Sequence, residues 1–186
     1  MLARSLKTPE ISLDTVLYYM RAGQDKSAAH VAQEGIRLVR EAADCKFVCR
    51  SMPLDLGECV KIGDWEIQSK SLKKHLAGCK EVVLLGASAG LGVDRVITAC
   101  GKKSGVLALA ADSAGGVLVE AVCDEAERYV GKAHPFRYSP GYGDFALEEQ
   151  RKLCELLQLQ KTIGVTLTEG LMLRPTKSVT AIIGIL

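Results

Sequence analysis

Residues 137–142 read Arg-Tyr-Ser-Pro-Gly-Tyr, and residues 168–180 read Thr-Glu-Gly-Leu-Met-Leu-Arg-Pro-Thr-Lys-Ser-Val-Thr. The pair Pro140-Gly141 predicts a tight turn. Arg137 offers a planar fork of N–H donors that suits a carboxylate, and Tyr142 adds an aromatic ring with a polar tip. A turn beside a solvated arginine is the ordinary interpretation of such a stretch. The combination of residue types nevertheless predicts a small-molecule binding loop.

The chain around these stretches mixes helices and strands without strict alternation. Apolar spacing and breakers predict helices over Leu13–Arg21, Ser27–Ala43, a short segment ending at Gly78, Leu91–Cys100, Gly105–Val130, and a segment capped by Asp144 that runs to Leu157. They predict strands within Lys46–Gln68 and over Glu81–Gly86, Thr162–Leu167 and Ser178–Leu186. This order favours an α+β fold with a mostly antiparallel sheet over a doubly wound sheet.

Length and composition indicate one domain. The 186 residues, 48% of them hydrophobic, suffice for a single core, with a helical N-terminal part over about residues 1–45. The charge of +2, from 24 basic and 22 acidic residues, gives no polybasic arm, so nucleic acid is not indicated. The apolar runs Val82–Leu85 and Thr180–Leu186 fall far below the roughly 20 residues that span a bilayer. We therefore expect a cytoplasmic protein without a membrane segment.

The seven cysteines are odd in number and scattered, which suits reduced, buried thiols. Cys45 and Cys49 could suggest a metal or iron–sulfur site, but position 52, where a third ligand would stand, is Met52. Alternation of Cys45, Phe47 and Cys49 along a short strand explains the spacing without a metal. We expect no metal site.

The patterns R-x-x-P-G-Y and T-E-x-x-x-x-x-P-x-x-S-V-[ST] resemble the activation domain of cobalamin-dependent methionine synthase, most closely over about residues 112–184. The resemblance implies a twisted antiparallel sheet flanked by helices. It also implies that S-adenosylmethionine binds and methylates cobalt(I) of cobalamin, after a flavodoxin-like reductant has reduced cobalt(II). Cobalt and sulfonium carry that chemistry, so no catalytic acid or base is expected.

The chain has no D-x-H-x-x-G signature of a cobalamin-carrying module. Cobalamin is therefore expected on a partner, either methionine synthase or another corrinoid protein. In this interpretation the chain is a methyltransferase component that acts only together with that partner. The alternative, from another class, is a non-catalytic module that docks on a corrinoid protein and keeps only the fold.

The resemblance also assigns binding residues one by one. Arg137 matches the arginine that grips the methionyl carboxylate, and Ser139 matches a position that contacts the ligand through its backbone. Tyr142 matches a tyrosine beside the sulfonium. Glu120 matches a helix carboxylate beside the methionyl end, although a solvated helix glutamate is an equal alternative. Glu169, in the second block, is the remaining candidate near the ligand.

A rival signal lies at Gly86–Gly92, Gly-Ala-Ser-Ala-Gly-Leu-Gly. As G-x-x-x-G-x-G it is similar to a dinucleotide loop, and as G-x-S-x-G to a hydrolase turn that exposes Ser88, with Asp112 or Asp124 and His134 as partners. About 80 residues precede the loop and no Tyr-x-x-x-Lys pair follows it. Too few strand-forming residues follow for a hydrolase sheet. Glycines that shape a strand-to-helix turn are the simpler interpretation.

Overall fold

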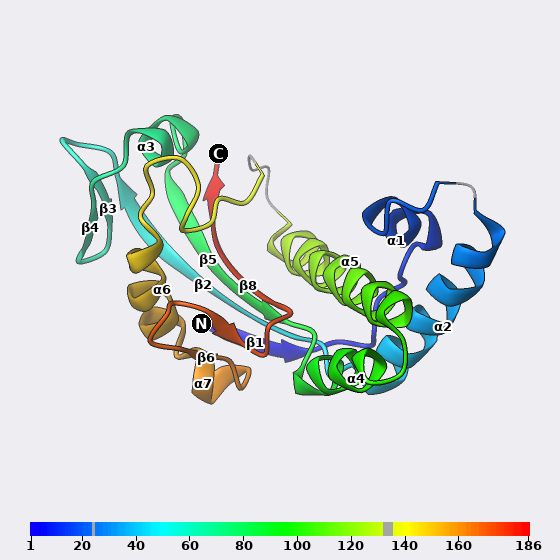
Figure 1. The fold of residues 1–186 in the computed structure, drawn as a ribbon. Helices are drawn as coiled ribbons and strands as arrows, with labels where there is room; N and C mark the ends of the chain where they lie inside the picture. The colour runs from blue at the N-terminus through cyan, green and yellow to red at the C-terminus, as the bar shows by residue number, and fades with distance from the viewer. Residues whose placement is uncertain (24, 132–135) are drawn as a thin grey trace.

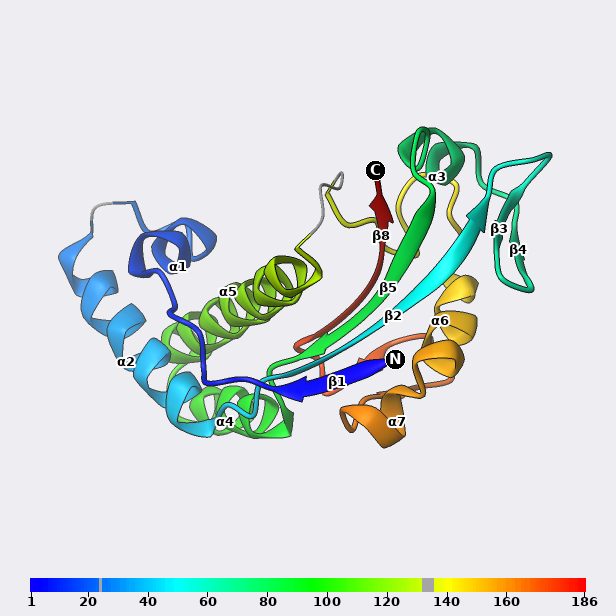
Figure 2. The same cartoon turned by 180° about the vertical axis from the view of Figure 1, so that it is seen from behind.

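The computed structural model describes residues 1–23, 25–131 and 136–186. Within this part of the chain, six strands form a curled antiparallel sheet (Figures 1 and 2). They are β1 (Leu2–Ser5), β2 (Lys46–Asp55), β3 (Val60–Ile62), β4 (Trp65–Ile67), β5 (Glu81–Ser88) and β8 (Ser178–Ile185). The order is β4-β3-β2-β5-β8, and β1 pairs with the first half of β2. The expected α+β class is confirmed.

Strand β5 forms the centre of the sheet because it is apolar on both faces. Its register pairs Leu85 with Cys49 of β2 and with Ala181 of β8. Val83 and Leu85 face one hydrophobic cluster and Val82 and Leu84 face the other. A strand buried on both sides reads as a continuous apolar run, as this one does.

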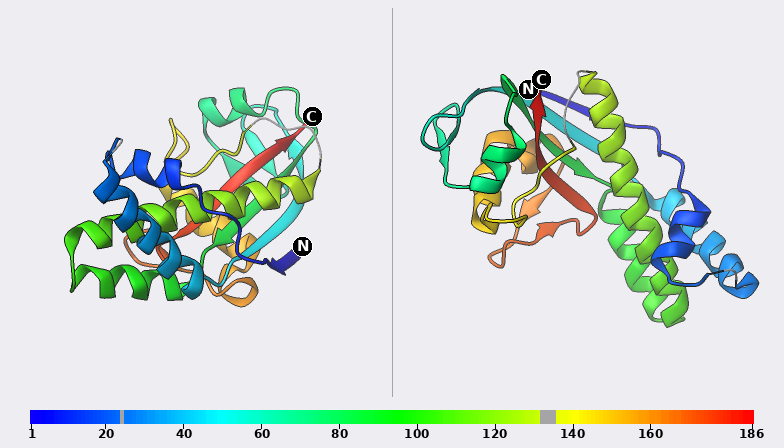
Figure 3. Two further views of the ribbon diagram at one scale, coloured as in Figure 1. Left: turned by 90° about the vertical axis from the view of Figure 1, so that its right-hand side faces the viewer. Right: turned by 90° about the horizontal axis from the view of Figure 1, so that it is seen from above.

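Four helices cover one face: α1 (Leu13–Tyr19), α2 (Lys26–Ala42), α4 (Leu91–Gly101) and α5 (Gly105–Val130). Helix α5 lies along the sheet, and α2 packs on α5 from outside (Figure 3). The small residues of α5, among them Ala110, Ala111 and Ala114, are fully buried at these contacts. This layer holds the larger hydrophobic core.

The opposite face carries shorter elements around a second core. They are α3 (Lys70–His75), the 3-10 turn η1 (Leu147–Glu149), α6 (Gln150–Leu157), α7 (Leu159–Thr162) and a hairpin of β6 (Thr166–Leu167) and β7 (Leu173–Arg174). Trp65 lies in this core, where its indole N–H donates to Glu149 Oε2 at 2.8 Å. The two cores lie on the two faces of one sheet.

Several predicted boundaries agree with the structure, and three predictions were wrong. Gly105–Val130 is one helix, as expected. The N-terminal part, in contrast, is not only helical, because residues 2–5 form a strand. Asp144 does not cap the helix that ends at Leu157; its carboxylate accepts hydrogen bonds at the start of α3 instead. Of Thr162–Leu167, only the last two residues are a strand, because Thr162 ends helix α7.

Among the described helices, α5 alone is long and apolar enough, by length and composition, to cross a membrane. It is longer than the apolar runs at 82–85 and 180–186, from which no membrane segment was expected. More than half of its apolar window is buried inside the protein. Packing against the sheet and α2 explains its composition, because a helix in the middle layer needs apolar residues on most sides.

All seven cysteines are free, and five of them are buried. Cys45, Phe47 and Cys49 all face the larger core, as strand alternation predicts. Burial raises the pKa of Cys45 to about 11 and that of Cys49 to about 12. These thiols therefore stay protonated and unreactive near neutral pH.

Candidate functional site

The segment Phe136–Phe145, here called the arginine loop, attaches to the free edge of β8. Tyr138 forms an antiparallel bridge with Ile182, with N–H···O distances of 2.9 and 2.8 Å in the two directions. The loop then turns at Pro140-Gly141, where Gly141 has a φ of +92° that favours glycine. The Gly141 N–H donates to the Phe145 carbonyl at 2.7 Å and closes the loop. The predicted tight turn is present.

The bridge determines where Arg137 points. Side chains alternate across a sheet, so Tyr138 faces the smaller core and Arg137 faces helix α5. There Arg137 Nη1 lies 2.6 Å from Glu127 Oε1 and 3.0 Å from Asp124 Oδ1. Its Nη2 pairs with Glu120. One guanidinium thus meets three carboxylates of one helix face.

The electrostatics of this cluster keep Arg137 charged. Burial alone would lower its pKa, but hydrogen bonds to Glu127 and Glu120 outweigh burial and raise the pKa above its ordinary value. The side chain of Glu127 is 16% exposed and that of Arg137 20%, whereas Glu120 and Asp124 are half-exposed. Glu127 is therefore the inner partner, and Glu120 remains reachable from solvent.

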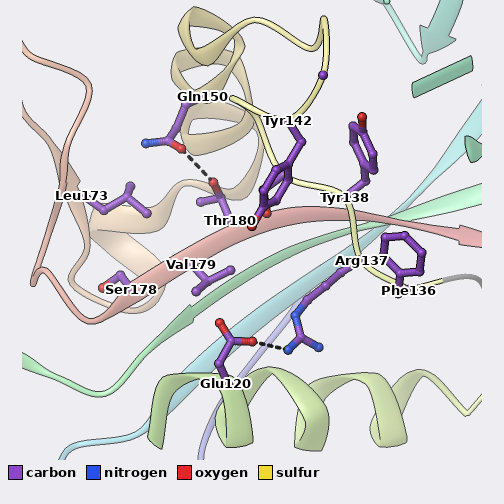
Figure 4. A pocket seen from close by; sticks show the side chains of 12 residues that line it. Glu120, Phe136, Arg137, Tyr138, Tyr142, Gln150, Leu173, Ser178, Val179 and Thr180 are labelled. Carbon is purple, nitrogen blue, oxygen red and sulfur yellow. Dashed lines mark hydrogen bonds and ion pairs between the residues drawn. The ribbon is translucent and has the colours of Figure 1, made fainter. Parts of the chain in front are cut away.

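A cleft of about 750 Å³ opens beside this cluster (Figure 4). It runs between α5, the arginine loop and the outer edge of β8. Its lining comprises Glu120, Phe136, Arg137, Tyr138, Ser139, Tyr142, Gly143, Gln150, Leu173, Ser178, Val179 and Thr180. Phe136 is 74% and Tyr142 60% exposed, so the cleft has aromatic groups open to solvent. Its volume lies within the usual range for small-molecule sites, about 300–1,000 Å³.

The end of the cleft away from Arg137 is neutral and polar. Gln150 and Thr180 are buried there, and the Thr180 hydroxyl donates to Gln150 Oε1 at 3.3 Å. Gln150 Nε2 donates to the Leu171 carbonyl at 2.9 Å. Alternate residues of a strand present their backbone groups to the same edge. The backbone of Thr180 therefore faces the cleft, as that of Ile182 faces Tyr138.

The structure brings four of the five predicted binding residues together. Arg137, Ser139, Tyr142 and Glu120 all line the cleft. Glu169 does not: it is exposed in the β6–β7 turn, where its carbonyl accepts a hydrogen bond from Arg151 at 3.3 Å.

Further cleft residues were not predicted. The cleft residues Phe136, Gln150 and Thr180 were not identified from the sequence. Neither were Asp124 and Glu127, which pair with Arg137 beside the cleft. The spacing of Glu120, Asp124 and Glu127 places them on one helix face, which could have linked the last two carboxylates to the first.

The rival segment Gly86–Gly92 shapes a junction between strand and helix. Ser88 is buried, and its hydroxyl accepts hydrogen bonds from the Gly90 N–H at 3.1 Å and the Ser178 hydroxyl at 3.0 Å. A side chain at Gly92 would lie 2.1 Å from the Ala42 carbonyl oxygen. Close packing of α4 on α2 therefore requires this glycine.

Two of the three side chains considered as hydrolase partners of Ser88 form ion pairs elsewhere, and the third lies outside the described residues. Asp112 pairs with Lys177 at 2.8 Å and Asp124 pairs with Arg137. His134 lies outside the described residues. In the part of the chain that the structure describes, no group of His, Cys, Asp and Glu side chains has the arrangement of a metal site.

The fold and the cleft first define a class: an α+β domain with a curled antiparallel sheet, helices on both faces and a small-molecule cleft at one sheet edge. Two comparisons show what the chain is similar to. Residues 119–185 match the family model described as "Vitamin B12 dependent methionine synthase, activation domain". Among solved structures, the chain is similar to a crystal structure of the MetH reactivation domain bound to AdoHcy.

That structural similarity has a TM-score of 0.66 at 14% sequence identity, and it covers 99% of this chain and 78% of the other. Comparison with curated proteins gives no match. The resemblance to the methionine synthase activation domain is confirmed, in fold over nearly the whole chain and in sequence over the C-terminal region.

Proposed function

We propose that the cleft binds S-adenosylmethionine, with the amino acid end of the ligand on Arg137 and Glu120. The observation that carries the proposal is the pairing of a guanidinium with a half-exposed carboxylate at one end of a ligand-sized cleft. An amino acid zwitterion needs this pair of opposite charges, since its carboxylate suits Arg137 and its ammonium suits Glu120. AdoHcy, named in the similar structure, is S-adenosylmethionine without the transferred methyl group.

The charge of the cleft suits a cationic ligand. Three carboxylates surround one guanidinium, which leaves an excess of negative charge beside the cleft. A zwitterion adds no net charge, and the sulfonium adds one positive charge. The exposed rings of Phe136 and Tyr142 offer faces on which such a cation is stabilised. The residues present therefore fit S-adenosylmethionine.

The remaining assignments belong to the same proposal. Ser139 lines the cleft next to Arg137, and its backbone is held by the turn to Tyr142, whose N–H donates to the Ser139 carbonyl at 3.3 Å. The neutral end around Gln150 and Thr180 offers amide, hydroxyl and backbone groups to an adenosine. Glu169 stays outside this arrangement, and we do not include it in the binding site.

We further propose that the chain is the reactivation unit of a corrinoid methyltransferase such as methionine synthase. Bound S-adenosylmethionine supplies an activated methyl group for cobalamin carried by a partner, in a reaction that also needs one electron from a flavodoxin-like reductant. The residues of this chain hold and orient the methyl donor and limit water, and none is needed as acid or base. We place such a unit in the cytoplasm, acting as a single domain.

Methyl transfer tests the function directly. The chain is incubated with S-adenosylmethionine carrying a labelled methyl group, a cobalamin-bearing methionine synthase that lacks its own reactivation domain, and a strong reductant. We expect label on cobalamin only when all components are present. Binding of the labelled donor without transfer to any corrinoid protein of the same organism would instead support the alternative, a docking module that keeps the fold.

A further inference from the structure

We propose that helix α3 clamps the arginine loop and that His75 is a positioning residue for Arg137. This inference rests on the proposed function only for the ligand affinity that it predicts. Helix α3 lies more than 60 residues before the loop in the sequence and does not line the cleft. The clamp consists of contacts at both ends of the helix with both ends of the loop.

The first end of the clamp is Asp144. Its carboxylate accepts hydrogen bonds from the Ser69 hydroxyl at 2.6 Å and from the backbone N–H groups of Lys70 and Ser71 at 2.8 and 3.0 Å. The Ser71 hydroxyl also contacts it. These hydrogen bonds lower the pKa of Asp144, those from Ser69 and Ser71 most strongly. The carboxylate thus stays ionised and holds the C-terminal side of the loop on the start of α3.

The second end is His75. Its Nε2 donates to the Phe136 carbonyl oxygen at 2.7 Å, in the tautomer that this acceptor requires. Its ring centroid lies 4.9 Å from that of Phe136 and 4.8 Å from that of Tyr138. His75 therefore contacts the residues immediately before and after Arg137. These contacts fix the backbone from which the Arg137 side chain extends.

Helix α3 is itself firmly anchored. Leu72 and Leu76 are fully buried in the smaller core, and the Ser69 hydroxyl caps the helix by accepting the Leu72 N–H at 3.0 Å. Because α3 is held in place by the smaller core, its contacts with the arginine loop fix the position of that loop. Because small displacements of a binding group weaken a bound ligand, loss of the His75 contact should weaken ligand binding without removing a ligand contact.

The test compares His75→Ala with His75→Gln, whose amide N–H can still reach the Phe136 carbonyl, and uses His30→Ala on the exposed face of α2 as the matched control. Titration calorimetry with S-adenosylmethionine should show affinity about three- to tenfold lower for His75→Ala, the range of one lost hydrogen bond. His75→Gln should recover most of it. His30→Ala should bind like the wild type.

Hydrogen exchange of the Tyr138 amide, which donates to Ile182, provides a readout without ligand. It should be faster in His75→Ala and restored in His75→Gln, while the Leu85 amide in the central strand is unchanged. Equal Tyr138 exchange in wild type and His75→Ala would overturn the clamp. Failure of the wild type to bind S-adenosylmethionine would refute the proposed function, while Tyr138 exchange would still decide the clamp.

Discussion

The three carboxylates around Arg137 should contribute unequally to stability, in the order of their burial. Glu127 Oε1 lies 2.6 Å from Nη1, with its side chain 16% exposed, whereas Asp124 lies at 3.0 Å and is 56% exposed. A charged hydrogen bond between partly buried groups contributes about 1.5–3 kcal/mol, and glutamine keeps part of it. Glu127→Gln should therefore cost about 1–2 kcal/mol. Asp124→Asn and Glu120→Gln, at half-exposed positions, should each cost less than about 1 kcal/mol.

Urea unfolding measures this order, with the fluorescence of Trp65, the sole tryptophan, as the signal. For a chain of this size, a loss of 1 kcal/mol corresponds to a melting temperature lower by about 2–4 °C. Glu34→Gln, which removes a carboxylate from the exposed pair with Arg37, is the control and should change little. The same three variants should reduce the affinity for S-adenosylmethionine in a different order, with Glu120→Gln reducing it most. A cost for Asp124→Asn equal to that of Glu127→Gln would refute the assignment of Glu127 as the inner partner.

Three further predictions concern the rest of the fold. Gly92→Ala should destabilise the protein by about 1–3 kcal/mol, because its Cβ would meet the Ala42 carbonyl. A Cβ at Gly116 would meet nothing within 4 Å, so Gly116→Ala should stabilise the protein slightly in the same urea titration. Ser88→Ala should leave S-adenosylmethionine binding unchanged in calorimetry, and covalent labelling of Ser88 by a fluorophosphonate would contradict this. Hydrogen bonds in the folded protein lower the pKa of Asp144. The stability that its ionised carboxylate adds to the fold is therefore present above about pH 4 and is lost as the pH falls through the folded pKa. The difference in unfolding free energy between wild type and Asp144→Asn should therefore shrink between pH 6 and pH 3, and a constant difference would argue against the carboxylate's role.

The sequence predicted what depends on local patterns. Apolar spacing was sufficient for α5, because one long helix produces its own periodic signal, and Pro140-Gly141 was sufficient for the turn. Local patterns failed where tertiary contacts decide. Asp144 has the residue type of a helix cap, but its partners at Ser69 and Lys70 lie some 75 residues earlier, so the nearest helix was the wrong choice.

The site shows the same division. Arg137 and Tyr142 were found because they share one loop, and Glu120 was found through the family resemblance. Gln150 and Thr180 were missed because each is an ordinary residue of its own element and becomes part of the cleft only when α6 meets β8. Glu169 belongs to the second block, but it lies in the turn between β6 and β7, which does not line the cleft.

Titration of the purified chain with S-adenosylmethionine by calorimetry, in wild type, Arg137→Ala and Arg137→Lys, tests the central claim most directly. We expect the wild type to bind and Arg137→Ala to lose about ten- to a hundredfold in affinity, the loss of a charged bidentate contact. Arg137→Lys should recover only part, because an ammonium cannot reproduce the planar fork. Equal affinity for wild type and Arg137→Ala, with both proteins folded by circular dichroism, would contradict the placement of the ligand at Arg137.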